Sequence, residues 1–156
     1  MKAMPQAGSA APDFSLPTDG GGTASLGAHK GRKVVIYFYP KADTPGCTKE
    51  SIDFNRLRPE FEKAGAAILG VSADPVKSQD KFKAKYDLTF PLASDPAHKM
   101  LEAYGVWGEK SMYGRKYMGI VRATFLIDQN GRVARVWPKV KVEGHAEEVL
   151  EAVRTL

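Results

Sequence analysis

The segment from Lys33 to Tyr39 is an almost uninterrupted apolar run that stops at Pro40. Its β-branched and aromatic residues favour a strand, and continuous rather than alternating apolarity is typical of a strand that is covered on both faces. Proline has no N–H to donate to a sheet, so the strand is expected to end there. The chain must therefore build layers on both sides of one central strand.

Further patterns place strands and helices in alternation along the chain. Extended segments are expected at 66–72, 89–92, 121–128 and 132–137, and helices at about 47–61, 74–86, 95–104 and 143–156. A length of 156 residues suits one domain. The pattern predicts an α/β fold with a mixed central sheet flanked by helices on both faces. We expect a single domain over residues 1–156, with residues 1–10 flexible.

The chain contains one cysteine, Cys47, and this count excludes an internal disulfide, a Cys-x-x-Cys pair and a cysteine-rich zinc site. No apolar run approaches the roughly 20 residues of a spanning helix, and the N-terminus lacks the apolar core of a secretory signal. We therefore expect no membrane segment. A cytoplasmic location is expected, because a free thiol stays reduced there.

The net charge is +5, and the positive charge is concentrated between residues 105 and 142. This segment contains eight Lys and Arg residues but only two acidic residues, Glu109 and Asp128. Such a segment could bind an anionic partner such as nucleic acid. It could equally form solvated strand edges and loops. We favour the second interpretation, because no nucleic-acid-binding motif accompanies the charge. Nucleic-acid binding is kept as a minor alternative.

Cys47 is expected in the first turn of a helix that Thr44 caps and Pro45 opens. Pro59 should kink or split this helix, whose apolar stripe is formed by Ile52, Phe54, Leu57 and Phe61. The unpaired N–H groups and the dipole of a helix N-terminus favour an anion, and hence a thiolate. A lone cysteine could instead be a packing residue. The neighbours Gly46 and Thr48 are poor core formers, and a glycine lets the backbone approach a small ligand closely. The pattern therefore favours a reactive thiolate.

Residues 40–47 have the form Pro-x-x-x-Thr-x-x-Cys, which resembles the peroxiredoxin active-site motif. The resemblance is greatest to the Q-type branch, also called bacterioferritin comigratory proteins. It extends in order over nearly the whole chain, through residues 37–41, 44–48, 105–110, 112–120 and 122–128. It implies a thioredoxin-like fold and a thiol-dependent antioxidant peroxidase acting on hydrogen peroxide and organic hydroperoxides.

The resemblance also implies a role for each matching residue. Cys47 would attack the peroxide as a thiolate and become sulfenic acid. Thr44 would hydrogen-bond the thiolate and the peroxide, and Arg122 would favour the thiolate and hold the substrate. Pro40 would shield the pocket from water, and the N–H groups of Gly46 and Cys47 would stabilise charge on the breaking O–O bond. No metal, flavin or haem is required.

Several other residues have two interpretations each. Glu50, one helical turn after the cysteine, either orients the arginine through an ion pair or faces water, and we favour the ion pair. Trp107 either lines the mouth of the active site or packs. His29, His98 and His145 are expected to be surface residues, because no spacing places one of them beside the cysteine.

The sequence departs from the family where a resolving cysteine would stand. Many Q-type members place it five residues after the first cysteine, where this chain has Ile52, and others place it near residues 81–85, which hold no cysteine. We therefore expect a catalytic cycle that uses one cysteine. We expect the chain to be a monomer rather than a dimer, as Q-type proteins often are. An external thiol, whether thioredoxin, glutaredoxin or a small thiol, would reduce the sulfenic acid. The alternative is a thioredoxin-like redox module without peroxidase activity, but Thr44 and Glu50 stand where its second cysteine would be.

Overall fold

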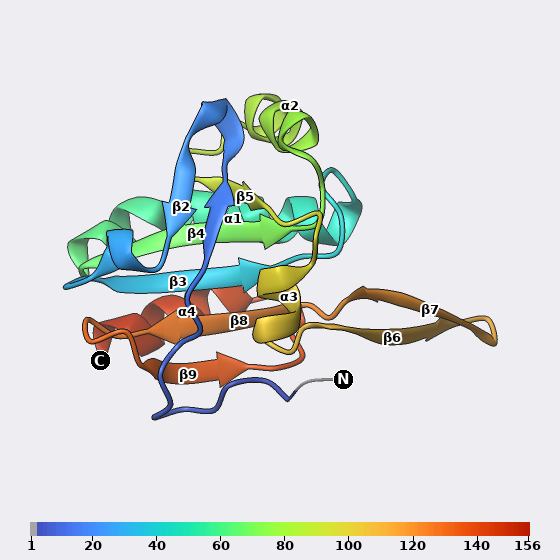
Figure 1. Cartoon of the computed structure of the whole chain (residues 1–156). Helices are drawn as coiled ribbons and strands as arrows, with labels where there is room; N and C mark the ends of the chain where they lie inside the picture. Colours follow the sequence, from blue (N-terminus) through green and yellow to red (C-terminus); the bar gives the residue numbers. More distant parts are fainter. Residues whose placement is uncertain (1–2) are drawn as a thin grey trace.

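The computed structural model describes residues 3–156 and is built on a five-stranded mixed sheet in the order β5-β4-β3-β8-β9 (Figure 1). The central strand is β3 (Lys33–Phe38), and all six of its residues are buried. It pairs in parallel with β4 (Ala66–Ser72), which pairs in parallel with β5 (Leu92–Ser94). On its other side it pairs antiparallel with β8 (Ala123–Ile127), which pairs antiparallel with β9 (Val133–Trp137). The predicted mixed central sheet is confirmed.

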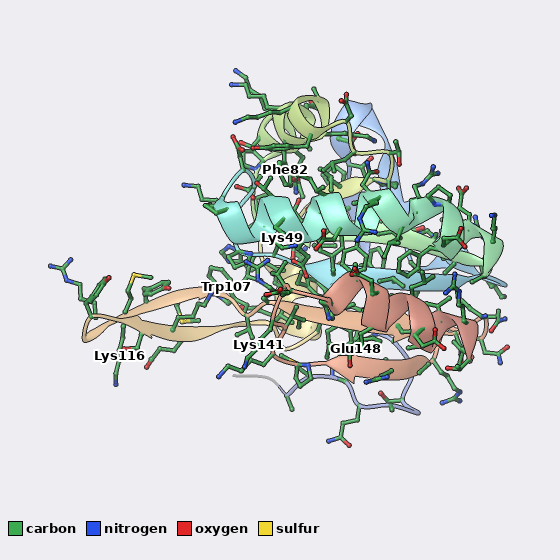
Figure 2. All side chains as sticks on the ribbon, turned by 180° about the vertical axis from the view of Figure 1, so that it is seen from behind. Lys49, Phe82, Trp107, Lys116, Lys141 and Glu148 are labelled. Atoms are coloured by element: carbon green, nitrogen blue, oxygen red, sulfur yellow. The ribbon has the colours of Figure 1, made fainter. Side chains whose placement is uncertain are left out.

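Helices cover one face of this sheet, as Figure 2 shows from behind. They are α1 (Pro45–Lys63), α2 (Val76–Tyr86) and α4 (His145–Arg154). Val35 and Tyr37 of the central strand point into the aromatic core beneath them. Every second side chain of β3 is buried on this face, which accounts for half of the apolar residues in the strand.

The opposite face is covered by α3 (Lys99–Ala103) and by the small antiparallel pair β1 (Ser15–Pro17) and β2 (Thr23–Ser25) (Figure 1). The alternate side chains of the central strand, Val34, Ile36 and Phe38, belong to this second core. Both faces of the sheet are therefore covered, as the sequence predicts. The fold class expected from the sequence, an α/β fold with helices on both faces, is confirmed.

Helix α1 begins where Thr44 and Pro45 predict. Thr44 has an extended backbone with ψ of 156°. Its hydroxyl does not cap the helix but donates to the carbonyl of Lys41 at 2.8 Å. The helix runs through Pro59 as one element, so the predicted break does not occur there. Ile52 lies 41% exposed, so the prediction that it belongs to the apolar stripe of this helix is wrong.

The third helix is shorter than predicted. The side chain of Asp95, itself buried, accepts the N–H groups of Lys99 and Leu101, at 3.2 and 2.9 Å. These bonds fix the helix start at Lys99 rather than at about residue 95. Extended backbone that was expected at 89–92 is found instead as β5 at Leu92–Ser94.

A two-stranded hairpin, β6 (Trp107–Met112) and β7 (Arg115–Ile120), projects from the body (Figure 1). Its turn uses Tyr113 and Gly114, both with positive φ, as a two-residue hairpin turn of type I′ requires. The sequence pattern predicts no strand here. The hairpin is mostly exposed on both faces, so it lacks the alternation that marks a half-buried strand.

Part of the segment 1–10 predicted to be flexible, residues 1–2, lies outside the described residues. The rest runs beside β9, where the N–H of Gly8 donates to the carbonyl of Val133 and the N–H of Val133 to that of Ser9. Among residues 3–156, no helix has the length and apolar character needed to cross a bilayer.

Candidate active site

Cys47 lies where the central strand passes into its helix. The chain leaves β3, turns through the loop that begins at Pro40, and enters α1, whose third residue is the cysteine. Pairing of β3 with β8 brings Phe38 opposite Ala123. Arg122 directly precedes that partner, so the register of the two strands places it at the same sheet edge as the cysteine. Residues 75 positions apart therefore meet because of strand order.

The guanidinium of Arg122 contacts two groups of α1. Its Nη2 donates to Sγ of Cys47 at 3.2 Å, and its Nη1 donates to Oε1 of Glu50 at 2.7 Å. Cys47 and Glu50 lie three residues apart on the helix and so face the same side. The planar fork of an arginine spans two such acceptors without changing shape.

Glu50 is a buried carboxylate, 1% exposed. Its Oε1 accepts from the arginine, whereas its Oε2 has no hydrogen-bond partner among the described residues. Burial raises the pKa of Glu50 to about 7, although Arg122 opposes that rise. The carboxyl can therefore hold or lose a proton near neutral pH.

Gly46 allows the arginine to approach the helix. A Cβ at this position would lie 3.2 Å from Nη2 of Arg122, which is tighter than ordinary contact. Pro40 is half-buried at the start of the loop, and Thr44 is half-buried next to the helix. The Thr44 hydroxyl proton is committed to the carbonyl of Lys41, so its oxygen is left as an acceptor.

Buried hydroxyls fix the helix and the strand that carry the site. The phenol of Tyr37 and the hydroxyl of Ser51, on α1, are 2.7 Å apart. The phenol of Tyr39 donates to Oε1 of Gln79 at 2.6 Å. These contacts join β3 to α1, and the residue after β3 to α2, and so hold the chain on either side of the loop between strand and helix.

Trp107 and His145 each contact residues other than the cysteine. Trp107 begins the hairpin, at its base in Figure 2, and stacks on His98 with ring centroids 3.8 Å apart. His145, the first residue of α4, is buried rather than on the surface as predicted, because its ring packs against Phe54 and Trp137 and lies 2.8 Å from the hydroxyl of Thr124. Within residues 3–156, no His, Cys, Asp and Glu side chains gather into a group that could hold a metal ion.

Lys110, one of the basic residues of the segment 105–142, lies closer to the site than the sequence indicates. The side chain is half-buried, and its Nζ donates to the carbonyl of Ile120 at 2.7 Å, two residues before Arg122. Burial and the charge of Arg122 lower the pKa of Lys110, while Cys47 acts in the opposite direction. The sequence signal for this course is Gly119, which lies two residues after Tyr117, the strand partner of Lys110, and leaves space for the lysine side chain.

The fold and the site together define a thiol enzyme on a thioredoxin-like sheet, with one cysteine held by an arginine and a buried carboxylate. The AhpC/TSA family matches residues 7–136. A curated relative, Peroxiredoxin Bcp of Xanthomonas campestris, is 54% identical over 142 residues, which cover 91% of this chain and 89% of the relative. Another, named Putative peroxiredoxin bcp, from Coxiella burnetii, is 52% identical and covers 93% and 96%.

Solved structures agree with these relatives. A structure of Xanthomonas campestris Peroxiredoxin Q superposes with a TM-score of 0.87 at 53% identity, over 91% of this chain and 90% of that one. A structure of the Bacterioferritin Comigratory Protein of the same species, described for its alkyl peroxide reduction activity, has a TM-score of 0.90 at 50% identity and covers 96% and 98%. This chain belongs to the AhpC/TSA family of peroxiredoxins. The predicted Q-type resemblance, the thioredoxin-like fold and the thiol peroxidase activity are confirmed.

Proposed function

We propose that Cys47 reduces hydrogen peroxide and organic hydroperoxides in a cycle that uses no second cysteine of the chain. The observation that carries this proposal is the 3.2 Å contact between Nη2 of Arg122 and Sγ of the single cysteine. A cationic donor at that distance stabilises a thiolate, the form in which a cysteine is a nucleophile.

In the first step the thiolate of Cys47 attacks the terminal oxygen of the hydroperoxide. An S–O bond forms and the O–O bond breaks, so the sulfur is oxidised to sulfenic acid and the peroxide is reduced to an alcohol, or to water from hydrogen peroxide. The leaving oxygen takes a proton. Arg122 would stabilise the negative charge that develops on the leaving oxygen as the O–O bond breaks, and the N–H groups of Gly46 and Cys47 at the helix N-terminus would add to this stabilisation.

Thr44, Pro40 and Glu50 support that step in our proposal. The Thr44 oxygen, whose own proton is donated to Lys41, accepts the O–H of the hydroperoxide and so aligns the O–O bond with the sulfur. Pro40 limits the access of water. Glu50 positions the arginine through its 2.7 Å ion pair.

The second half of the cycle requires thiols from outside the chain. One external thiol attacks the sulfenic acid, which releases water and leaves a mixed disulfide on Cys47. A second thiol attacks that disulfide, restores the free cysteine and leaves as an external disulfide. The relative from Xanthomonas campestris has been solved with either of two cysteines replaced by serine, whereas this chain has one cysteine.

Position 52 supports this one-cysteine cycle. Many family members carry the resolving cysteine there, and here it is Ile52, which is 41% exposed on α1. We further propose that the protein works as a monomer in the cytoplasm, where small thiols, thioredoxin and glutaredoxin are available to reduce it. Substrate-binding roles for Gly46 and Trp107 belong to the same proposal, Trp107 at the base of the hairpin.

A reductant-pairing assay tests the cycle. Loss of hydrogen peroxide is followed with glutathione, glutaredoxin and thioredoxin supplied in turn, for the wild type and for Cys47→Ser. We expect turnover with at least one of these reductants and none with the serine variant. Peroxide loss that persists in Cys47→Ser would overturn the proposal, as would a single turnover with no reductant able to continue it.

A further inference from the structure

The β6–β7 hairpin carries most of the large apolar side chains that the protein exposes. Within residues 3–156 there are six such side chains, and four of them lie on this hairpin: Met112, Tyr113, Tyr117 and Met118. Tyr113, in the turn, is 99% exposed, and Met112 beside it is 57% exposed. Single exposed apolar residues are ordinary on a protein surface, but four on one hairpin indicate a surface that contacts something else.

The two faces of the hairpin differ in charge. Met112 lies directly opposite Arg115 in the ladder, and Tyr117 is on the same face, because side chains two residues apart along a strand point the same way. In the described part of the chain, no carboxylate lies within ion-pair distance of Arg115. Glu109, the single acidic residue of the hairpin, belongs to the other face, where it lies 3.7 Å from Lys116. The face that carries Met112 is therefore both apolar and cationic.

The positive charge continues at the base of the hairpin. Lys139 and Lys141 are exposed and flank Val140, whose N–H donates to the carbonyl of Arg122 at 3.0 Å, two residues after β7 ends. Figure 2 shows Lys141 near this base. A negatively charged surface that lies along the hairpin would therefore be attracted over its whole length.

Shape and charge together narrow the kind of partner. The hairpin projects from the body as a finger (Figure 1), and a lipid bilayer admits a protruding apolar tip without a groove to receive it. Tyrosine favours the interface of a bilayer, and anionic headgroups attract Lys and Arg. A second copy of the same face would bring one Arg115 toward another. A nucleic-acid strand would neutralise the arginine but leave Met112 and Met118 in water.

We infer that the β6–β7 hairpin is a docking surface for an anionic lipid bilayer. Met112 and Tyr113 enter the interfacial region, and Arg115 contacts the headgroups. The contact is peripheral, like that of a helix that lies on a membrane without crossing it. Six residues of a strand span about 20 Å, so docking by this hairpin holds the active site, which begins two residues after β7 at Arg122, within about that distance of the bilayer.

Sedimentation with vesicles tests this docking surface. Binding of the full chain is measured at low salt to vesicles of phosphatidylcholine alone and of phosphatidylcholine with about one quarter phosphatidylglycerol. We expect the wild type to bind the anionic vesicles at least about tenfold more strongly, and high salt to remove most of this preference. Met112→Ser with Tyr113→Ser, and separately Arg115→Gln with Lys116→Gln, should each weaken binding to the anionic vesicles by about tenfold.

Lys30→Gln with Arg32→Gln is the matched control. It also removes one lysine and one arginine, both exposed, but from the segment before β3, at the opposite end of that strand from Cys47. Its binding should equal that of the wild type. All variants should reduce hydrogen peroxide at the wild-type rate, which verifies that they fold. Tyr113→Trp adds a direct readout, because its indole emission should shift to shorter wavelength with the anionic vesicles.

Three results would overturn the docking surface. The first is a wild type that binds neither kind of vesicle, and the second is an equal loss of binding in the hairpin variants and in the control. The third is binding of a single-stranded oligonucleotide by the wild type without binding of the anionic vesicles, which would assign the hairpin to nucleic acid instead. Because hydrogen peroxide reduction is measured without lipid, failure of the docking surface leaves the peroxidase cycle intact.

Discussion

Arg122 joins Cys47 to Glu50 through a single guanidinium, with Nη2 3.2 Å from Sγ and Nη1 2.7 Å from Oε1. The two acceptors lie on consecutive turns of one helix, whereas the arginine directly precedes β8, the strand that pairs with β3 in the sheet. The nucleophile is therefore held by tertiary structure rather than by its local sequence alone. A change at any of the three residues alters the charge that the other two experience.

Replacement of Arg122 tests how much of the rate depends on this fork. Arg122→Met removes both donors and leaves Glu50 buried without its cation, and we expect kcat/KM for hydrogen peroxide to fall by about 10²–10³-fold. Arg122→Lys restores the charge but a single ammonium cannot span both acceptors, so we expect it to recover only part of that loss. Stopped-flow oxidation of Cys47 measures the rate. Arg115→Met, an exposed change on the hairpin, serves as the control, and equal rates in Arg122→Met and in this control would contradict the assignment.

A methyl group at position 46 tests the close approach of the arginine. Gly46→Ala would place Cβ 3.2 Å from Nη2 of Arg122 and displace it from the sulfur. We expect kcat/KM to fall by roughly tenfold, while the free energy of unfolding stays the same or rises slightly because alanine favours a helix. Gly27→Ala is the matched control, since no atom lies within 4 Å of its added Cβ. A full rate in Gly46→Ala would show that the contact with Arg122 does not set the rate.

The buried carboxyl of Glu50 makes stability depend on pH. Burial raises its pKa to about 7, against an ordinary value of 4.5, even though Arg122 opposes the rise. Between these values the folded state holds a proton that the unfolded state has lost, so stability falls as pH rises. The stabilisation is fully present below about pH 4.5 and is lost through about pH 7.

Denaturant unfolding of the wild type and of Glu50→Gln at pH 4.5 and pH 8 measures this effect. The glutamine still accepts from Arg122 but does not titrate. Relative to this variant, we expect the free energy of unfolding of the wild type to fall by about 3 kcal/mol between the two pH values, at about 1.4 kcal/mol for each unit of pKa shift. A difference that is independent of pH, or that grows with pH, would contradict the buried titrating carboxyl.

Two substitutions of Thr44 distinguish a hydrogen-bonding role of this residue from a packing role. Its oxygen remains free to accept the hydroperoxide proton because its own proton goes to the carbonyl of Lys41 at 2.8 Å. Thr44→Ser keeps the hydroxyl and should retain most of the rate. Thr44→Val keeps the shape without the oxygen, and we expect kcat/KM to fall by about 10²-fold in peroxide assays. Equal rates in the two variants would mean that only the volume of Thr44 matters.

The sequence predicts the central sheet and the start of α1 because their signals are local. A continuous apolar run and a Thr-Pro pair need no knowledge of the rest of the chain. Contacts between distant residues are different: the meeting of Arg122 with Cys47 depends on β8 pairing beside β3, and the family resemblance, not the pattern, suggested it. Lys110 illustrates the same limit, because its contact with the carbonyl of Ile120 depends on a side chain that crosses Gly119 on a hairpin that no hydrophobic pattern reveals.

The central claim is that Cys47 alone carries the oxidised sulfur and waits for an external thiol. The most direct measurement treats the reduced protein with one equivalent of hydrogen peroxide in the absence of thiols and follows intact mass and dimedone labelling. We predict a monomer that gains the mass of one oxygen atom and forms a dimedone adduct at Cys47. The Cys47→Ser variant should form no such adduct. Oxidation of Cys47 no faster than that of a free small thiol would contradict the claim.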